Sequence, residues 1–289
     1  MKKILITGAS GMLGSQLAKY FRNKADLFLF CKDDFYQNKK VNVFSIDLRS
    51  NSIELNINAI DPDIIIHCAA LTNVDYCEFN QDEAIEVNSH ILGRLKESAP
   101  NAKIIYISSD AVFADNMPFA TEEDNTNPLN AYGKSKLLGE SFLDLKKDIV
   151  IRTTIIGKNI NPNKVSFCEW IINNIKADKA VNLFSDSLFN PITIWDISLE
   201  IEYLINSELT GIYNICGTEA YSKYTLGLEL CRKMGLNQSL INSVKMFNME
   251  FAAKRSIDQT LDPSKYIKDS GRNLPDLEST VGSLIQRFL

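Results

Sequence analysis

Short apolar runs alternate with longer amphipathic segments through the first half of the chain. The runs are continuously apolar rather than alternating with polar residues, which is typical of strands buried on both faces. They predict strands at residues 4–6, 27–30, 41–44, 64–66, 103–107, 149–151 and, later in the chain, 211–215. Helical periodicity predicts helices at residues 12–21, 167–176 and 195–205. This alternation of strand and helix indicates a parallel sheet wrapped by helices.

Composition excludes several classes of protein. The chain has 289 residues with 31 basic and 36 acidic side chains, a formal net charge of −5. Proteins that bind nucleic acids carry a basic excess, so nucleic acid is not an expected partner. The longest apolar stretch, residues 64–71, is interrupted by His67 and is too short for a membrane span, and the first residues do not form a signal peptide. We therefore expect a cytoplasmic protein without a membrane partner.

The cysteines give no sign of a metal site. They are scattered without close spacing, and the chain has only two histidines. A metal cage needs clustered ligands, and a disulfide framework is typical of a small secreted chain. We expect no bound metal and six free thiols, at Cys31, Cys68, Cys77, Cys168, Cys216 and Cys231.

A glycine-rich turn at residues 8–14 follows the first strand and opens the first helix. Gly8 permits a tight turn, Gly11 lets the backbone approach a pyrophosphate, and Gly14 lets helix and strand pack closely. The amides at the start of the helix then face the phosphates. This order predicts a Rossmann-type dinucleotide site. The residues expected to contact the cofactor here are Gly8, Ser10, Gly11, Met12, Leu13 and Gly14.

The end of the second strand bears on the choice between NADPH and NADH, because an acid there binds the ribose 2′-hydroxyl. Lys32 occupies that place, and a lysine favours the 2′-phosphate of NADPH. Asp33 and Asp34 follow directly, so NADH stays an alternative. Asp47 and Leu48 follow the third strand, where a carboxylate can accept from the adenine amino group. Asp47 is equally suited to a turn or a helix cap.

A tyrosine and a lysine four residues apart are the candidate catalytic pair. Asn130 is a suitable N-cap for a helix that places Tyr132 and Lys136 on one face. A tyrosine ordinarily has a pKa of about 10, and we expect an ammonium one turn away to bring that pKa toward neutrality. Ser109, just past the fifth strand, is placed to hydrogen-bond a substrate carbonyl. His67, on an apolar strand, is expected only to pack.

These motifs resemble the extended short-chain dehydrogenase/reductase superfamily, and within it the dTDP-4-dehydrorhamnose reductase branch. The resemblance runs over nearly the whole chain, and its motifs stand in the family's order. They are the glycine loop, His67-Cys68-Ala69-Ala70, Val87-Asn88, Ser108-Ser109-Asp110, residues 127–136, Gly139-Glu140, Arg152-Thr153, and residues 190–193, 211–214 and 255–262.

The regular rhythm of strand and helix loosens after about residue 157. Together with the resemblance, this predicts an α/β fold of two domains. A Rossmann-type, doubly wound parallel sheet is expected over residues 1–156, and a smaller mixed α/β domain that mainly binds substrate over residues 157–289. Segments around residues 190–215 are expected to return to the first domain.

The resemblance also implies roles for individual residues. Ser109 would hold a keto oxygen, Tyr132 would donate a proton to it, and Lys136 would bind the nicotinamide ribose. Lys254 and Arg255 are candidates for meeting a substrate diphosphate, although an ordinary exposed basic pair is an equal alternative. Further expected cofactor contacts are Leu48, Cys68, Ala69, Ala70 and Thr72, and further expected substrate contacts are Val74, Asp110 and Ile155.

Some positions depart from the pattern of the branch. Ile155 stands where an indole is common, Ala111 where a tyrosine is common, and residues 186–190 lack the usual glycine. The side chains expected around the sugar thus differ from those of the branch, whereas Ser109, Tyr132 and Lys136 are all present. The sequence therefore leaves open an activated sugar other than that of the branch. Ala111 also stands where nucleotide-sugar dehydratases carry a glutamate, which disfavours dehydration.

The sequence therefore predicts an NADPH-preferring reduction of the 4-keto group of a nucleotide-activated deoxysugar in surface polysaccharide synthesis. Two alternatives stay open. One is an epimerase of the same superfamily, and the other is a non-catalytic regulatory subunit like the β subunit of methionine adenosyltransferase. The resemblance is compatible with a homodimer.

Overall fold

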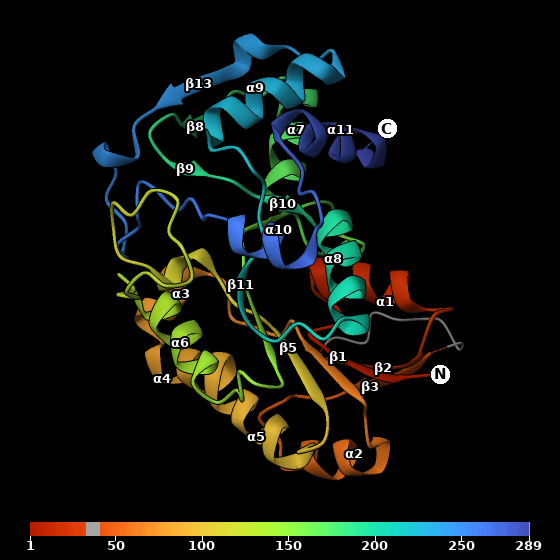
Figure 1. The fold of residues 1–289 in the computed structure, drawn as a ribbon. Helices are drawn as coiled ribbons and strands as arrows, with labels where there is room; N and C mark the ends of the chain where they lie inside the picture. The colour runs from red at the N-terminus through yellow and green to blue at the C-terminus, as the bar shows by residue number, and fades with distance from the viewer. Residues whose placement is uncertain (33–40, 289) are drawn as a thin grey trace.

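The computed structural model describes residues 1–32 and 41–288, so Asp33 and Asp34 lie outside the described residues. Its centre is a seven-stranded sheet in the order β11-β6-β5-β4-β1-β2-β3, with every neighbouring pair parallel (Figure 1). The strand order reverses beside β1, which confirms the predicted doubly wound, Rossmann-type sheet. The strands are β1 (Lys3–Thr7), β2 (Asp26–Cys31), β3 (Asn42–Ser45), β4 (Ile64–His67), β5 (Lys103–Ile107), β6 (Ile149–Arg152) and β11 (Gly211–Asn214).

Both faces of the sheet are buried, because successive side chains of a strand point to opposite sides. In β1, Ile4 and Ile6 pack into one core while Leu5 packs into the other. The first core also holds side chains of α1, α8 and α10, and the second holds side chains of α2 and α5 (Figure 1). These helices span α1 (Met12–Phe21), α2 (Ile53–Ile60), α5 (Ile91–Ser98), α8 (Ile194–Asn206) and α10 (Ser264–Ser270).

Helix α6 (Ala131–Glu140) lies close to β5, and a glycine allows this approach. A Cβ at Gly139 would lie 2.6 Å from the Tyr106 hydroxyl of β5. Ala131 at the start of α6 packs with Cys77 and Ala84 from the segment before β5. That segment consists of α3 (Val74–Phe79), α4 (Gln81–Ile85) and the π-helical turn η1 (Glu86–His90), which continues into α5.

The later part of the chain adds a smaller group of elements, at the top of Figure 1. Its strands β8 (Val181–Phe184) and β13 (Ile241–Val244) pair in parallel, and their apolar side chains pack with those of α7 (Phe167–Lys176) and α9 (Lys223–Met234). Helix α11 (Leu277–Phe288) packs beside α9 in a second small core. The remaining elements are η2 (Asp110–Val112), β7 (Ile155–Ile156), β9 (Leu188–Phe189), β10 (Ile192–Thr193), β12 (Tyr221–Ser222), η3 (Gln238–Leu240) and η4 (Met246–Asn248).

Several predicted elements are confirmed closely. Helices α1 and α7 begin and end at the predicted residues, and α8 extends one residue beyond its prediction at each end. The segment around residues 190–215 contributes to the large sheet, because α8 packs into its first core and β11 pairs with β6. The boundary between two domains near residue 156 stays a prediction.

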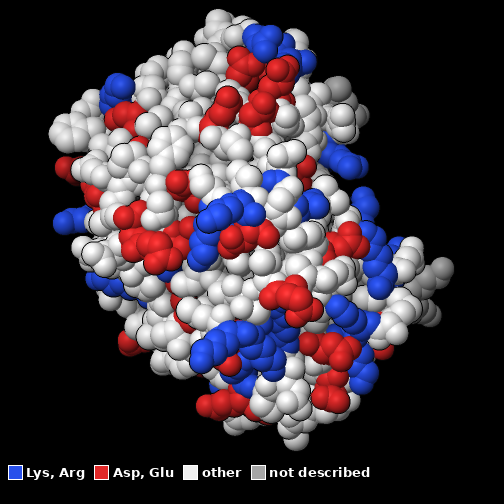
Figure 2. Space-filling model, in the orientation of Figure 1, with Lys and Arg blue, Asp and Glu red and all other residues white. Residues whose placement is uncertain are grey.

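Within the described part of the chain, none of the helices combines the length and apolar character that crossing a bilayer requires. Acidic and basic side chains are interspersed over the face shown in Figure 2. No disulfide joins any of the six cysteines, all of which lie in the described part of the chain, as the sequence predicts. Among residues 1–32 and 41–288, no group of three or more His, Cys, Asp or Glu side chains is arranged to hold a metal ion.

Candidate active site

The glycine loop lies between β1 and α1 and is shaped for a close ligand. Gly8 has a φ of +65°, and a Cβ there would lie 2.6 Å from the Ala69 amide nitrogen, so only glycine fits. Gly11 is the N-cap of α1 and has no side chain with which to cap the first turn of that helix. Amides at a helix start attract phosphate oxygens. The loop therefore fits the pyrophosphate of a dinucleotide, with Cys68 and Ala69 directly against it.

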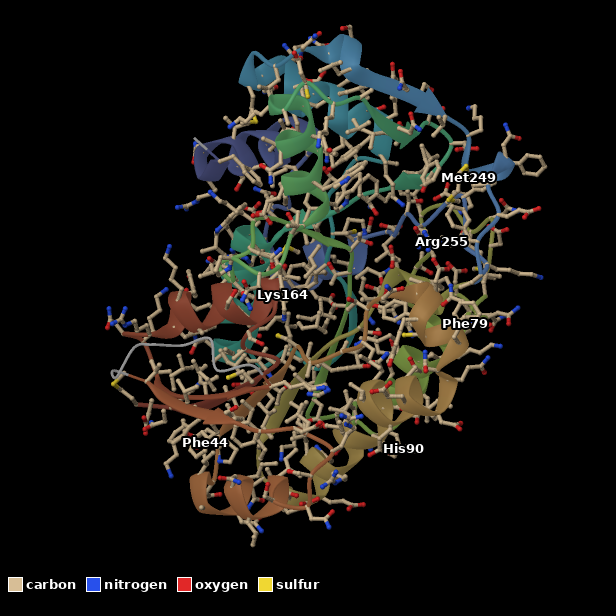
Figure 3. The ribbon with its side chains drawn as sticks, turned by 180° about the vertical axis from the view of Figure 1, so that it is seen from behind. Phe44, Phe79, His90, Lys164, Met249 and Arg255 are labelled. Atoms are coloured by element: carbon tan, nitrogen blue, oxygen red, sulfur yellow. The ribbon has the colours of Figure 1, made fainter. Side chains whose placement is uncertain are left out.

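A basic side chain that sequence reasoning missed also reaches this loop. The Lys164 ammonium donates to the Ser10 carbonyl oxygen at 3.4 Å, and Figure 3 shows the side chain beside α1. Lys164 comes from the turn before α7, far from the loop in sequence. No local sequence pattern around Lys164 predicts this contact.

The ends of β2 and β3 place the residues expected to bind the adenosine half of the cofactor. Lys32 is exposed just past β2, whereas Leu48 is buried in the second core. The Arg49 guanidinium holds Asp47 through contacts of 2.6 Å and 3.0 Å, and it keeps the pKa of that carboxyl well below its usual range. Arg49 also contacts Glu83 at 3.0 Å. Asp47 is thus an ionised acceptor in a turn, and Arg49 is a neighbour that the sequence did not single out.

Ser109 and Tyr132 meet where the sheet's fifth strand ends. Ser109 caps η2, accepting from the Ala111 amide at 3.2 Å, and its hydroxyl lies close enough to Tyr132 to influence the pKa of that phenol. Tyr132 lies in the first turn of α6, where the Asn130 side chain accepts from the Gly133 amide at 2.9 Å, as the predicted N-cap does. A Cβ at Gly133 would collide with the Ala111 carbonyl oxygen. Glycine therefore lets α6 lie against η2 and brings the two hydroxyls together.

The pKa of Tyr132 moves in the direction opposite to our expectation. Burial raises it to about 12, and the hydrogen bond from Ser109 opposes the rise only in part. The Lys136 ammonium instead donates to the Ile107 carbonyl oxygen at 2.7 Å and lies 4.1 Å from the centre of the Tyr106 ring. Burial lowers the pKa of Lys136 to about 7. The Tyr132 phenol therefore keeps its proton at neutral pH.

A buried ion pair supports α6 one turn beyond Lys136. Glu140 accepts from the Arg152 guanidinium at 3.1 Å and 2.7 Å, and from the Ser108 hydroxyl at 2.6 Å. Both charged side chains are buried. Because opposite charges at short range stabilise one another in a buried site, this pair anchors α6 to β6. The negative charge of Glu140 also opposes the loss of the proton from Lys136.

Asp110 is hydrogen-bonded to the residue that precedes it, Ser109. One carboxyl oxygen accepts from Ser109 at 2.7 Å, and the other accepts from the Thr154 hydroxyl. Burial raises the pKa of Asp110, and the Lys223 ammonium from the start of α9 opposes that rise. Thr154 and Lys223 are further residues that the sequence analysis missed, because each comes from a different, distant segment.

Arg255 and Lys254 differ in their surroundings. Arg255 forms an ion pair with Asp75 of α3 at 2.6 Å and lies 4.2 Å from the centre of the Phe251 ring. Its Nε is buried without a hydrogen-bond partner in the described structure. Figure 3 shows Met249, Arg255 and Phe79 following one another along one edge. Lys254 is exposed, and its carbonyl accepts from Asn130 at 2.8 Å.

The remaining predicted contacts are spread around the same crevice. Ala70 is half-buried in the loop after β4, Thr72 is exposed further along it, and Val74 opens α3 half-buried. Ile155 opens β7 and packs against the first core of the sheet. His67 is buried, bonded to Thr7 at 2.7 Å, and burial lowers its pKa to about 3, so it packs as a neutral ring.

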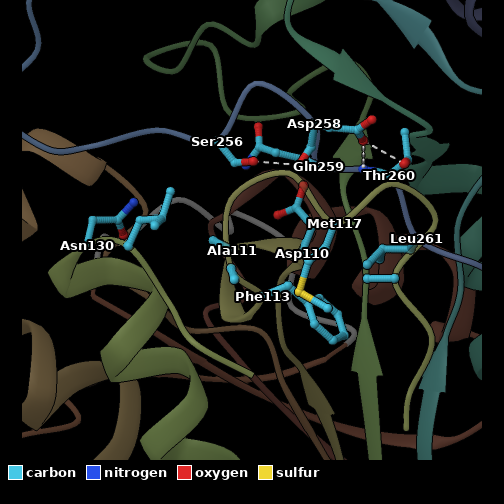
Figure 4. Close-up of a pocket in the computed structure, with 13 residues that line it drawn as sticks. Asp110, Ala111, Phe113, Met117, Asn130, Ser256, Asp258, Gln259, Thr260 and Leu261 are labelled. Atoms are coloured by element: carbon cyan, nitrogen blue, oxygen red, sulfur yellow. Dashed lines mark hydrogen bonds between the residues drawn. The ribbon is translucent and has the colours of Figure 1, made fainter. Parts of the chain in front are cut away.

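A cavity opens at Asp110 and Ala111, which directly follow Ser109 in the chain (Figure 4). Asp110, Ala111 and Asn130 line it from the sheet side, and Ser256 and Gln259 line it from the later part of the chain. The small Ala111 side chain, where the resembling branch commonly has tyrosine, forms part of the wall. The buried carboxyl of Asp110 thus connects Ser109, to which it is hydrogen-bonded, with this cavity.

A doubly wound parallel sheet with a glycine loop at its switch point and Ser109, Tyr132 and Lys136 at its carboxyl edge defines a Rossmann-type member of the extended short-chain dehydrogenase/reductase class. The family model "RmlD substrate binding domain" matches residues 1–289. The chain belongs to this family.

Similar proteins include reductases and a subunit of methionine adenosyltransferase. A "probable low-salt glycan biosynthesis reductase Agl14" from Haloferax volcanii is 27% identical, over 98% of this chain and 97% of its own length. The methionine adenosyltransferase 2 subunit beta of Bos taurus is 29% identical, over 84% of this chain and 75% of its own length. Among solved structures, a dTDP-4-dehydrorhamnose reductase from Bacillus anthracis in complex with NADP has a TM-score of 0.89 at 25% identity, covering 99% of both chains.

Proposed function

We propose that this protein uses NADPH to reduce the 4-keto group of a nucleotide-activated deoxysugar. The single observation that carries the proposal is the placement of Ser109, Tyr132 and the buried Lys136 together where β5 ends, with the Lys136 ammonium donating to the Ile107 carbonyl. The similarity of the chain to a probable glycan biosynthesis reductase and to an NADP-bound dTDP-4-dehydrorhamnose reductase supports the same reaction. A role in surface polysaccharide synthesis follows from this substrate class.

Separate residues of the chain would bind the cofactor and act on the sugar. NADPH, when bound, supplies a hydride to the sugar carbon. The glycine loop would hold its pyrophosphate, Lys32 its 2′-phosphate and Lys136 its nicotinamide ribose. Ser109 orients the keto oxygen, and Tyr132 donates the proton that this oxygen takes up. A phenol with a pKa of about 12 suits this direction, because it is protonated before the reaction.

The later half of the chain is proposed to bind the sugar nucleotide. Arg255 and the exposed Lys254 would meet its diphosphate, and Val74, Asp110 and Ile155 would line the sugar. Residues 157–289 would thus act mainly as a substrate domain. The non-aromatic side chains of Ala111 and Ile155, in place of a tyrosine and an indole, favour a sugar different from dehydrorhamnose or one bound without aromatic stacking.

The test is NADPH oxidation by the purified chain with dTDP-4-keto-6-deoxyglucose and its GDP, CDP and UDP counterparts. We expect turnover with one of them and a fall in kcat of about 10²- to 10⁴-fold in Tyr132→Phe. NADPH affinity, measured by fluorescence titration, should stay within about twofold in this variant. Turnover that survives the substitution would refute the role of Tyr132, and lost NADPH affinity would assign this residue to binding.

The regulatory function is the second candidate, favoured by the similarity to the methionine adenosyltransferase subunit. It predicts tight NADPH binding without oxidation for any sugar nucleotide, together with copurification of a larger enzyme. An epimerase would instead convert the sugar with no net consumption of NADPH. We also propose a cytoplasmic homodimer, to be tested by cell fractionation and by light scattering of the purified protein.

A further inference from the structure

The glycine loop packs against the end of β2. The Ala9 amide donates to the Phe30 carbonyl oxygen at 3.0 Å, and Thr7 pairs with Phe30 in the parallel register of β1 and β2. Ser10 is the next residue of the loop, and Lys32 stands just past the strand. In a Rossmann-type fold, the end of the second strand contacts the 2′ position of the adenosine ribose. Ser10 and Lys32 therefore border the place where this position of a bound dinucleotide would lie.

A second cation reaches the same place from the later part of the chain. The Lys164 ammonium donates to the Ser10 carbonyl oxygen at 3.4 Å, beside α1 in Figure 3. The side chain is exposed, so no surrounding core fixes its direction. Because a lysine ammonium stands on a flexible four-carbon stem, it can turn from this carbonyl to a nearby phosphate oxygen without a movement of the backbone.

The backbone of the turn that carries Lys164 is held in place. Asn161 is buried, and its carbonyl accepts from the Lys164 amide at 3.1 Å. Glu169, in the first turn of α7, accepts from the Asn159 amide at 3.0 Å and from the Ser166 amide at 2.9 Å. One carboxylate thus ties together the two ends of this turn. Because the backbone is already ordered, binding a phosphate with Lys164 requires the ordering of its side chain alone.

We propose that Lys164, together with Lys32, binds the 2′-phosphate of NADPH and so favours NADPH over NADH. This inference rests on the proposed use of NADPH. A phosphate monoester carries about two negative charges near neutral pH, and ammonium groups form charge-assisted hydrogen bonds with its oxygens. NADH has a neutral hydroxyl group at the same position, so a second ammonium there gains little. Two lysines from segments far apart in the chain would thus meet at one phosphate.

The test measures binding to the full-length wild type and to Lys164→Met. NADPH and NADH are titrated by fluorescence, and 2′,5′-ADP and 5′-AMP by calorimetry, so no turnover is needed. In the variant, Kd should rise about tenfold or more for NADPH and 2′,5′-ADP, and stay within about twofold for NADH and 5′-AMP. Lys158→Met is the matched control. Lys158 is an exposed lysine of the same segment that donates to the Arg287 carbonyl at 3.4 Å, and its variant should keep all four Kd values.

Salt dependence provides a further readout. Added NaCl should weaken NADPH binding more in the wild type than in Lys164→Met, because the variant has one charge fewer to screen. Lys32→Met should show the same selective loss of NADPH and 2′,5′-ADP.

An unchanged Kd for NADPH in Lys164→Met would overturn the inference. An equal loss of NADPH and NADH would overturn it too, because it would assign Lys164 to the pyrophosphate or to the shape of the loop. A wild type that binds NADPH selectively through Lys164 but reduces no sugar nucleotide would overturn only the proposed reaction.

Discussion

The side-chain amide of Asn130 donates to the main-chain carbonyl of Lys254 at 2.8 Å, while its oxygen caps the helix that carries Tyr132. One residue thus joins the catalytic helix to the segment that leads into Arg255. Arg255 is tied in turn to Asp75 of α3. The segment that carries Lys254 and Arg255 therefore shares a fixed contact with α6, and we expect a disturbance of one to be transmitted to the other.

Two substitutions separate the functions of Asn130. Asn130→Asp keeps the capping oxygen but removes the donor to Lys254, so we expect near wild-type stability and a KM for the sugar nucleotide raised about tenfold, the effect of losing ~1.4 kcal/mol. Asn130→Ala also removes the cap and should lower the free energy of unfolding by about 1 kcal/mol. Urea unfolding and initial-rate kinetics measure the two effects. Equal KM values for the wild type and Asn130→Asp would show that the contact with Lys254 does not influence substrate binding.

Gly133→Ala should misplace the catalytic helix. The added Cβ would collide with the Ala111 carbonyl, so α6 must move away from Ser109. Because misplacements of this kind are costly in catalysis, we expect kcat to fall by about tenfold or more with NADPH affinity retained. Gly282→Ala is the matched control, because a Cβ there has no neighbour within 4 Å and α11 should gain up to about 1 kcal/mol. An unchanged kcat in Gly133→Ala would show that the contact between α6 and η2 can adjust to the added Cβ without loss of activity.

Breaking the buried pair of Glu140 and Arg152 should destabilise the fold. Glu140→Gln leaves an uncompensated buried guanidinium, so the free energy of unfolding should fall by about 3–5 kcal/mol. The exposed pair of Arg232 and Glu229, at 2.7 Å, is the control, and Glu229→Gln should cost at most about 0.5 kcal/mol. Urea denaturation measures both. Similar losses in the free energy of unfolding of the two variants would mean that the buried pair of Glu140 and Arg152 stabilises the fold no more than an exposed pair does.

Lys136 should destabilise the folded chain in a pH-dependent way. Its pKa is lowered from 10.5 to about 7, so between these values the unfolded chain binds a proton that the folded chain does not. The contribution of Lys136 to the free energy of unfolding therefore rises with pH across this range, and its cost is fully present below about pH 7.

We accordingly expect Lys136→Met to be more stable than the wild type near pH 6.5, by an amount on the order of a few kcal/mol, with the difference shrinking toward pH 9.5. Thermal unfolding at about these two pH values provides the measurement. Lys134→Met, at an exposed position of the same helix, should show no such trend. A stability difference for Lys136→Met that is independent of pH would mean that the buried amine does not lose its proton in this range.

Local patterns accounted for much of the architecture. Continuous apolar strands, the glycine loop and the Asn130 cap each express a short-range rule, because strand burial, tight turns and helix capping depend on neighbouring residues. The predicted bounds of α1 and α7 and the positions of the sheet strands therefore agree with the structure. The meeting of Ser109 and Tyr132 was also foreseeable, since both follow the carboxyl edge of a parallel sheet.

Tertiary structure alone decided the contacts between distant segments and the protonation of buried groups. Lys164 reaches Ser10 and Lys223 faces Asp110, and no periodicity in the sequence brings either pair together. The prediction that the pKa of Tyr132 is lowered was wrong for the same reason. It considered the charge of a nearby lysine but not the burial of the phenol, which raises this pKa. The sequence determined which chemical groups stand at the edge of the sheet. The packing of later segments over that edge decides how far these chemical groups are removed from water. Removal from water then determines the charge of each buried group.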